Sequence, residues 1–114
     1  MFVSCSDEDK DNAHDYYVKY TVSLVGQNYP RIEYNVSTDQ GVQTFYTTEH
    51  SFEKVYGPVK SGFVANINFD CSELKGYAGA YGSATIEISR DNEPFSIKAT
   101  EQYKTNINLT YKIE

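Results

Sequence analysis

The sequence predicts an all-β protein built as an antiparallel β-sandwich of seven or eight strands. Aromatic residues make up 15% of the 114 residues, with 11 Tyr and 6 Phe, and such residues favour strands over helices. Short runs in which apolar and polar residues alternate follow one another, separated by clusters of Gly, Pro, Asn and Asp. This is the pattern of half-buried strands joined by turns, and the length suits one domain.

The first two strands are predicted because apolar and polar residues alternate along the chain. Residues 16–25 place an apolar side chain at every even position, namely Tyr16, Val18, Tyr20, Val22 and Leu24. Residues 26–30 end this strand, because Gly and Asn accept turn conformations and Pro30 cannot join a central ladder. The apolar positions of the second strand are Ile32, Tyr34 and Val36.

The middle of the chain contains a hairpin and the clearest core strand. Residues 38–41 predict a turn into a strand at 42–47. Residues 50–56 are less regular and are expected to end at the Gly57-Pro58 pair. In the core strand, the inward residues are Phe63, Ala65, Ile67 and Phe69, and the outward residues are Val64, Asn66 and Asn68.

Three more strands complete the sandwich. Their apolar positions are Ala84, Ile86 and Ile88; Phe95, Ile97 and Ala99; and Ile107, Leu109, Tyr111 and Ile113. Strands this short, with turns at regular intervals, favour a sandwich of immunoglobulin-like form. A β-barrel is the alternative, but it favours strands of more even length. Residues 72–82 interrupt the pattern, since they are Gly-rich and long for a hairpin loop; a helical turn and a connection between sheets both suit them.

Charge divides the chain into two parts. Residues 1–15 carry five acids and one lysine, a net charge of −4, whereas residues 16–114 carry 11 acids and nine bases, a net charge of −2. Residues 1–15 are therefore interpreted as an acidic, disordered tether and residues 16–114 as the folded domain. No basic stripe is present to neutralise phosphates, so nucleic-acid binding is not expected.

Cys5 is the most informative residue for localisation. It follows the short apolar segment Met1-Phe2-Val3-Ser4 and precedes an acidic stretch, as the lipidated cysteine of a bacterial lipoprotein does. The four residues before Cys5 are interpreted as the remnant of a signal peptide. Cys5 is thus predicted to carry acyl chains that anchor the protein to a membrane. Cys71, the other cysteine, is expected to be a small buried apolar residue.

The acidic segment does not satisfy the calcium-loop pattern. Asp7, Asp9 and Asp11 occupy its first, third and fifth positions, but Asn12 stands where Gly is needed and Val18 where a bidentate Glu is needed. No metal site is therefore expected here.

Catalytic and cofactor chemistry are not expected either. His14 and His50 are too few for most metal sites, and no nucleophile motif accompanies them. Asp70 and Glu73 are a pair of acids beside a loop, an arrangement too common to indicate glycoside hydrolysis. The chain is predicted to be a non-enzyme without a cofactor.

Residues 76–82 are the preferred candidate for ligand binding. The glycines allow unusual backbone conformations, and Tyr77 and Tyr81 are expected to offer flat amphipathic rings to a sugar or peptide. The alternative is that both tyrosines fold back onto the core. Asn35 and Asn108 begin glycosylation sequons by spacing alone, which a bacterial protein does not normally use.

Two resemblances add to this interpretation. The segment Phe2-Val3-Ser4-Cys5-Ser6-Asp7-Glu8-Asp9 resembles the cleavage region of Bacteroidetes-type surface lipoproteins, which implies a modified Cys5 and a surface-facing domain. The body is similar to the β-sandwich domains of MmpS-like proteins in the runs 18–23, 32–35, 51–65 and 85–92, although it has no Trp where that family has a Pro-Trp pair.

The predicted function is a non-catalytic lipoprotein of the bacterial cell envelope, at the outer-membrane surface. Its β-sandwich is expected to bind an extracellular or periplasmic glycan or protein ligand through its loops. The alternative is an accessory or structural subunit of a membrane transport or surface assembly complex.

Overall fold

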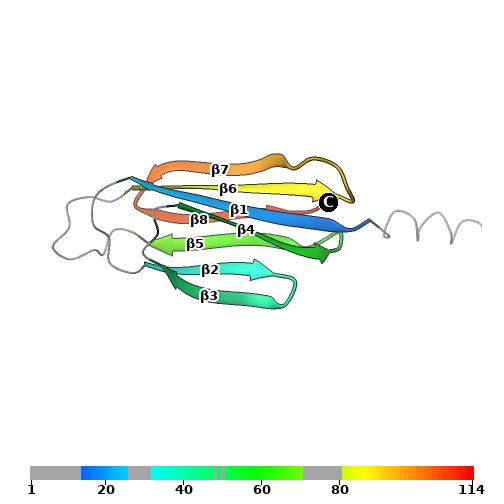
Figure 1. The fold of residues 1–114 in the computed structure, drawn as a ribbon, viewed down its shortest axis with the longest axis horizontal. Coiled ribbons are helices and arrows are strands. Elements are labelled where there is room, and N and C mark those ends of the chain that lie inside the picture. Colours follow the sequence, from blue (N-terminus) through cyan, green and yellow to red (C-terminus); the bar gives the residue numbers. More distant parts are fainter. Residues whose placement is uncertain (1–13, 26–31, 48, 50, 71–80) are drawn as a thin grey trace, which may run out of the picture.

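The computed structural model describes residues 14–25, 32–47, 49, 51–70 and 81–114, and there the chain forms eight β-strands (Figure 1). They are β1 (Tyr16–Val25), β2 (Ile32–Thr38), β3 (Gly41–Thr47), β4 (Ser51–Val59), β5 (Val64–Asp70), β6 (Tyr81–Arg90), β7 (Ser96–Lys104) and β8 (Asn106–Lys112). Two four-stranded sheets result, with strand orders β4-β1-β6-β7 and β3-β2-β5-β8. Every pairing between these strands is antiparallel, so the predicted antiparallel β-sandwich is confirmed.

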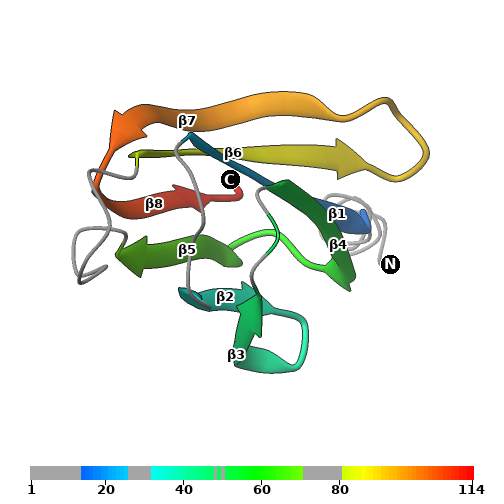
Figure 2. The ribbon, with the colours of Figure 1, turned by 60° about the vertical axis from the view of Figure 1, so that its left-hand side comes forward.

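The strand order of this sandwich differs from that of immunoglobulin domains. In constant-type immunoglobulin domains the first and second strands are neighbours in one sheet. Here β1 lies between β4 and β6, while β2 lies between β3 and β5 in the other sheet (Figure 2). Only the β2–β3 and β6–β7 connections join strands within one sheet, so the chain repeatedly crosses between the two layers.

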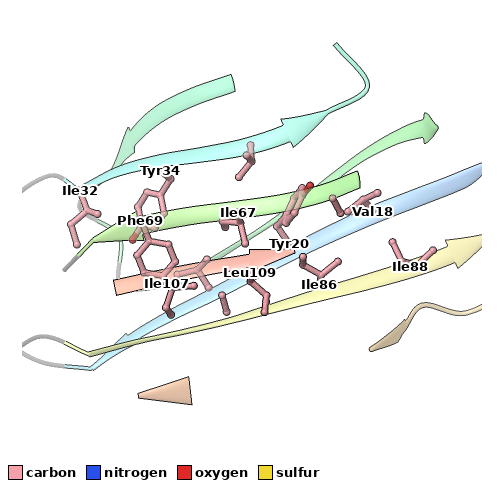
Figure 3. Close-up of a cluster of buried hydrophobic side chains, with 14 of the residues drawn as sticks. Val18, Tyr20, Ile32, Tyr34, Ile67, Phe69, Ile86, Ile88, Ile107 and Leu109 are labelled. Atoms are coloured by element: carbon pink, nitrogen blue, oxygen red, sulfur yellow. The ribbon is translucent and has the colours of Figure 1, made fainter. Parts of the chain in front are cut away.

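The hydrophobic core lies between the two sheets and uses the alternating positions that the sequence predicts (Figure 3). The inward residues of β1, β2, β5, β6 and β8 are buried, apart from Tyr16 and Tyr111, which are partly buried at the edge of the core. Burying each large apolar side chain contributes roughly 1.5–3 kcal/mol. Tyr34 is fully buried, and its ring lies 5.4 Å from that of Phe45 and 4.8 Å from those of Phe52 and Phe69, which extends the core as an aromatic cluster.

Tyr20 joins the two sheets through its hydroxyl. The pairing of β2 with β5 stops at Val36 and Ile67, and in the same register the next pair would be Ser37 and Asn66. The Tyr20 hydroxyl fills this opening: it donates to the Ser37 carbonyl oxygen at 2.6 Å and accepts from the Asn66 backbone N–H at 3.1 Å. A side chain from β1 thus completes the backbone hydrogen bonding of the opposite sheet.

We expect the stability contribution of Tyr20 to depend on alkaline pH. Burial raises the pKa of Tyr20 to about 12, although the Asn66 N–H partly opposes this shift. The folded state therefore holds the proton more tightly than the unfolded chain, whose value is 10.0. Stability is full below pH 10 and decreases as the pH rises towards 12, with about 1.4 kcal/mol lost at pH 11. Urea titrations measure the free energy of unfolding of wild type and of Tyr20→Phe. The difference between these two free energies should decrease by this amount from pH 8 to pH 11. A difference that stays constant would contradict the prediction.

The β2–β3 hairpin forms at the predicted residues. Thr38 pairs with Gly41 across the two-residue loop, and Gly41 has a φ of +97°, which favours glycine. The Thr38 hydroxyl accepts from the Gln40 backbone N–H at 3.0 Å and donates to the Gly41 carbonyl at 2.7 Å. This side chain closes the turn that sets the register of the two strands.

The prediction for the fourth strand is wrong in its end point. The Gly57-Pro58 pair was expected to end it, but β4 continues through a cis Gly57-Pro58 peptide to Val59. The strand tolerates the proline because it lies at the sheet edge. A register shift between Tyr16 and Val18 accompanies these residues, so Gly57 and Pro58 occupy an irregular part of an edge strand.

Strand β7 departs from the expected alternation because it contains a bulge. Ile97 pairs with the outward residue Glu87, whereas Ala99 pairs with the inward residue Ile86, and the register shifts between them. The extra residue turns Ile97 towards solvent, where 65% of it is exposed. The apolar pattern alone does not reveal this inserted residue.

Thr21 offers a route to a more stable variant. It lies on β1, and its hydroxyl oxygen is buried without a hydrogen-bond partner in the described part of the chain. A buried hydroxyl without a partner is destabilising, and Val has a nearly identical shape and favours strands. We therefore expect Thr21→Val to raise the free energy of unfolding by about 1 kcal/mol in urea titrations. A lower value than wild type would mean that the hydroxyl has a partner in solution.

Candidate ligand-binding face

The outward face of the β3-β2-β5-β8 sheet carries an ordered set of polar side chains. The observed cross-strand pairs, extended in the same register, place twelve side chains in three rows. Each row runs across the sheet from β3 to β8. The first row is Val42, Ser37, Asn66 and Thr110; the second is Thr44, Asn35, Asn68 and Asn108; and the third is Tyr46, Glu33, Asp70 and Asn106. We call these twelve residues the amide face, because five of them are asparagines.

Hydrogen bonds between side chains join all four strands across this face. The relay starts at a threonine on β3, passes through the asparagines of β2 and β5, and ends on β8. Its contacts are Thr44 Oγ1 to Asn35 Oδ1 (2.6 Å), Asn35 Nδ2 to Asn68 Oδ1 (3.3 Å), Asn68 Nδ2 to Asn66 Oδ1 (3.0 Å), and Asn66 Nδ2 to Asn108 Oδ1 (2.7 Å) and Thr110 Oγ1 (2.8 Å). These contacts fix the amide orientations before any ligand arrives.

Asparagine is an unusual choice for these positions. It is depleted in strands, yet β5 and β8 carry it at Asn66, Asn68, Asn106 and Asn108, each on the outward side. Ordinary surface residues such as Thr or Lys would suit a solvated sheet at least as well. The concentration of amides on one face is therefore the feature that calls for a functional explanation.

Glu33, Asp70 and Asn106 of the third row line a shallow groove. Its volume is about 450 Å³, and its walls come from Glu33, Asn35, Asn68, Phe69, Asp70 and Asn106. Phe69 belongs to the buried aromatic cluster, so the groove lies on a rigid part of the core. The register that pairs Asn35 with Asn68 also places Glu33 opposite Asp70, and none of the twelve residues of the amide face is basic. The groove is therefore acidic and rich in amides.

Of the site residues predicted from the sequence, the structure describes only Tyr81. Cys5, Cys71 and Tyr77 lie outside the described residues, as does most of the 76–82 segment. Tyr81 is the first residue of β6, where it pairs with Val25, and it is 46% exposed. It is thus a strand residue at the end of the β4-β1-β6-β7 sheet.

Only some of the remaining candidates fall within the described residues. His50, Glu73 and the acids at positions 7, 9 and 11 lie outside the described residues, whereas Asp70 belongs to the third row of the amide face. In the part of the chain that the structure describes, no three His, Cys, Asp or Glu side chains gather as a metal site would require. The sequon residues Asn35 and Asn108 both belong to the amide face, a role that their sequons do not suggest.

His14 helps to fix the start of the folded domain. Its Nδ1 lies 2.8 Å from Asp91 Oδ2, and the Asp91 carboxylate also accepts from the Asp15 backbone N–H at 3.0 Å. These two hydrogen bonds, the backbone one first, lower the pKa of Asp91. Lys60 donates to Asp15 at 2.7 Å. The first residues of β1 are thus tied to the β6–β7 turn and to the segment after β4.

A second cavity, of about 240 Å³, lies beside β6, β7 and β8, with Tyr16, Arg90, Lys98 and Tyr111 among its lining residues. Arg90 is paired with Glu93 at 3.3 Å, and Glu93 and Glu114 also line the cavity. Opposite charges of similar number therefore meet here, and they offer no selectivity for an anion or a cation.

Together, the fold and the amide face define a small β-sandwich that presents one polar sheet surface with a shallow acidic groove. No protein-family model, curated protein or solved structure matches the chain. Among the described residues, no helix is long and apolar enough to cross a membrane.

Proposed function

We propose that this protein is a non-catalytic lipoprotein of the bacterial cell envelope whose β-sandwich binds a ligand on its amide face. The observation that carries the binding role is the relay of asparagines across four strands beside the acidic groove. Cys5 carries the acyl anchor in this proposal, and the residues between Cys5 and His14 form the tether. The lipoprotein part rests on the sequence around Cys5.

The position of the groove suits an anchored binding protein. His14 and the first residues of β1 lie at one end of the sandwich, beside Asp91. The third row lies at the other end, where β2 begins and β5 ends (Figure 1). In this proposal, the tether joins the sandwich at the end opposite the groove.

The alternative function is an accessory or structural subunit that pairs through a sheet edge. The β4-β1-β6-β7 sheet is poorly suited to this role. Its edge strands are β4 and β7, both of which have register shifts, and β4 also carries Pro58. Proline and bulges prevent an edge strand from pairing with another chain. This observation favours binding on a sheet face over assembly through these edges.

The anchor is tested with the full-length gene expressed in its own host. We expect the intact mass of the native protein to include acyl chains, and Cys5→Ala to move the protein from the membrane fraction to the soluble fraction. Protease treatment of intact cells then distinguishes surface exposure from a periplasmic location. An unmodified mass with a soluble protein would contradict the anchor.

The binding role is tested by NMR with 15N-labelled full-length chain and probes of four classes: neutral oligosaccharides, a polyamine, a sulfated or uronate-rich polysaccharide, and a neutral peptide. We expect the side-chain amide signals of the amide face to shift with at least one class, while the signals of Thr85 and Thr100 on the other sheet stay in place. If the amide face responds to no class, the proposed binding role is wrong.

A further inference from the structure

We propose that the ligand of the amide face is a neutral oligosaccharide that lies in the groove along the third row. This inference rests on the proposed binding function and adds the ligand class. It follows from three properties of the groove: its mixture of hydrogen-bond donors and acceptors, its charge, and the aromatic residue at the end of the row.

The hydrogen-bonding groups of the groove match hydroxyl groups. An asparagine side chain offers two donors and an acceptor, whereas a carboxylate only accepts. Asn106 and Glu33 both line the groove, and neither side chain makes a hydrogen bond or ion pair within the described residues. A sugar hydroxyl donates and accepts at the same atom, so it satisfies both kinds of group, whereas an ammonium group only donates.

The relay leaves the amides beside the groove correctly oriented for such a ligand. Asn35 and Asn68 line the groove, and each is held by hydrogen bonds to its neighbours. Asn35 and Asn68 each donate one side-chain N–H within the relay, so the second N–H of each amide remains for a ligand. Because these side chains are already ordered, they lose little conformational entropy when a ligand binds, and this raises the affinity of the site.

The charge of the face argues against an anionic ligand. Glu33 and Asp70 both line the groove, and the amide face contains no Lys or Arg. Like charges opposite each other across two strands are destabilising, and a sulfate, phosphate or uronate would add further repulsion. A hydroxyl donor from a neutral ligand instead stabilises the Glu33 carboxylate through a charge-assisted hydrogen bond.

Tyr46 supplies the apolar contact that a sugar ring needs. It continues the third row on β3, where it pairs with Glu33, and it is 53% exposed. One face of a pyranose presents C–H groups and its rim presents hydroxyls. The apolar, rigid ring of a tyrosine packs against the C–H face of the sugar. The acids and amides in the same row can then bind the hydroxyls.

The test compares variants of the full-length chain against neutral gluco-, galacto-, manno- and xylo-oligosaccharides by NMR titration. We expect one or more of them to shift the Asn106, Asn35 and Asn68 side-chain amide signals. Asn106→Leu and Glu33→Leu should each weaken this binding by about tenfold or more, as the loss of a ligand hydrogen bond predicts. Thr100→Leu, on the outer face of the other sheet, is the matched control and should leave the affinity unchanged.

Each result separates the ligand class from the binding role. A response of the amide face to the polyamine, the polyanion or the peptide, but not to any neutral oligosaccharide, overturns the glycan inference and leaves the binding role intact. Oligosaccharide binding that is unchanged by Asn106→Leu and Glu33→Leu also overturns it, because the ligand would then lie elsewhere. No response to any class contradicts both proposals.

Discussion

Tyr20→Phe is expected to lower the free energy of unfolding by about 2–4 kcal/mol near pH 7. The substitution keeps the buried ring but removes the hydroxyl that bonds both the Ser37 carbonyl and the Asn66 N–H. Each buried backbone group left without a partner costs roughly 1–3 kcal/mol. Because the stability of a small domain is only about 5–15 kcal/mol, a loss of this size is large. Urea denaturation followed by tyrosine fluorescence measures it.

Tyr56→Phe is the matched control for this substitution. Tyr56 packs against Tyr20, with 6.1 Å between ring centroids, and its hydroxyl makes no hydrogen bond within the described residues. Its removal should change the stability by less than about 0.5 kcal/mol. In Tyr20→Phe, hydrogen exchange at the Asn66 amide should accelerate relative to that of Ile67. Equal stabilities for the two variants would mean that β2 and β5 close directly once the hydroxyl is absent.

The sequence was sufficient to predict most of the strands and their buried residues, because apolar residues occupy every second position of the core strands. The inward positions of β1, β2, β5, β6 and β8 are correct, since each strand alternates one buried and one exposed side chain. The errors occur where an extra residue breaks that period, at Ile97 in β7 and around Gly57 in β4. A bulge changes the direction of a side chain without changing the residue types around it.

The strand order and the Tyr20 contact were beyond prediction for a different reason. Alternation shows which side chains point inward but not which strands are neighbours. Tyr20 was correctly predicted to be buried, but its partners Ser37 and Asn66 lie 17 and 46 residues away along the chain. Only the packing of the two sheets shows that its hydroxyl enters the gap between β2 and β5.

The candidate site was not predicted from the sequence, although a signal for it is present. Asn66 and Asn68 were recognised as outward residues of a strand, and Asn35 and Asn108 only as the start of sequons. Their common face appears once β2, β5 and β8 are known to be neighbours. The available signal was the repeated use of asparagine at outward strand positions, where its low β-propensity calls for a reason.

Gly57→Ala is expected to lower the free energy of unfolding by about 3–4 kcal/mol. A Cβ atom at this position would lie 2.8 Å from the Tyr16 carbonyl oxygen and 2.8 Å from Cδ2 of Tyr17. The first of these contacts involves the backbone of β1, which is held between β4 and β6 and cannot shift freely. In addition, the φ of +148° at Gly57 disfavours any side chain. Overpacking and backbone strain each contribute roughly 1–3 kcal/mol.

Gly62→Ala separates these two contributions. Gly62 also has a positive φ, +95°, but a Cβ atom there meets no other atom within 4 Å. Its substitution therefore reports backbone strain alone and should cost about 1 kcal/mol. The difference between the two variants in urea denaturation is the energy of the close approach between β4 and β1. If both variants lose the same stability, β4 has moved away from Tyr16 and Tyr17 in solution, and the glycine serves only the backbone conformation of the edge strand.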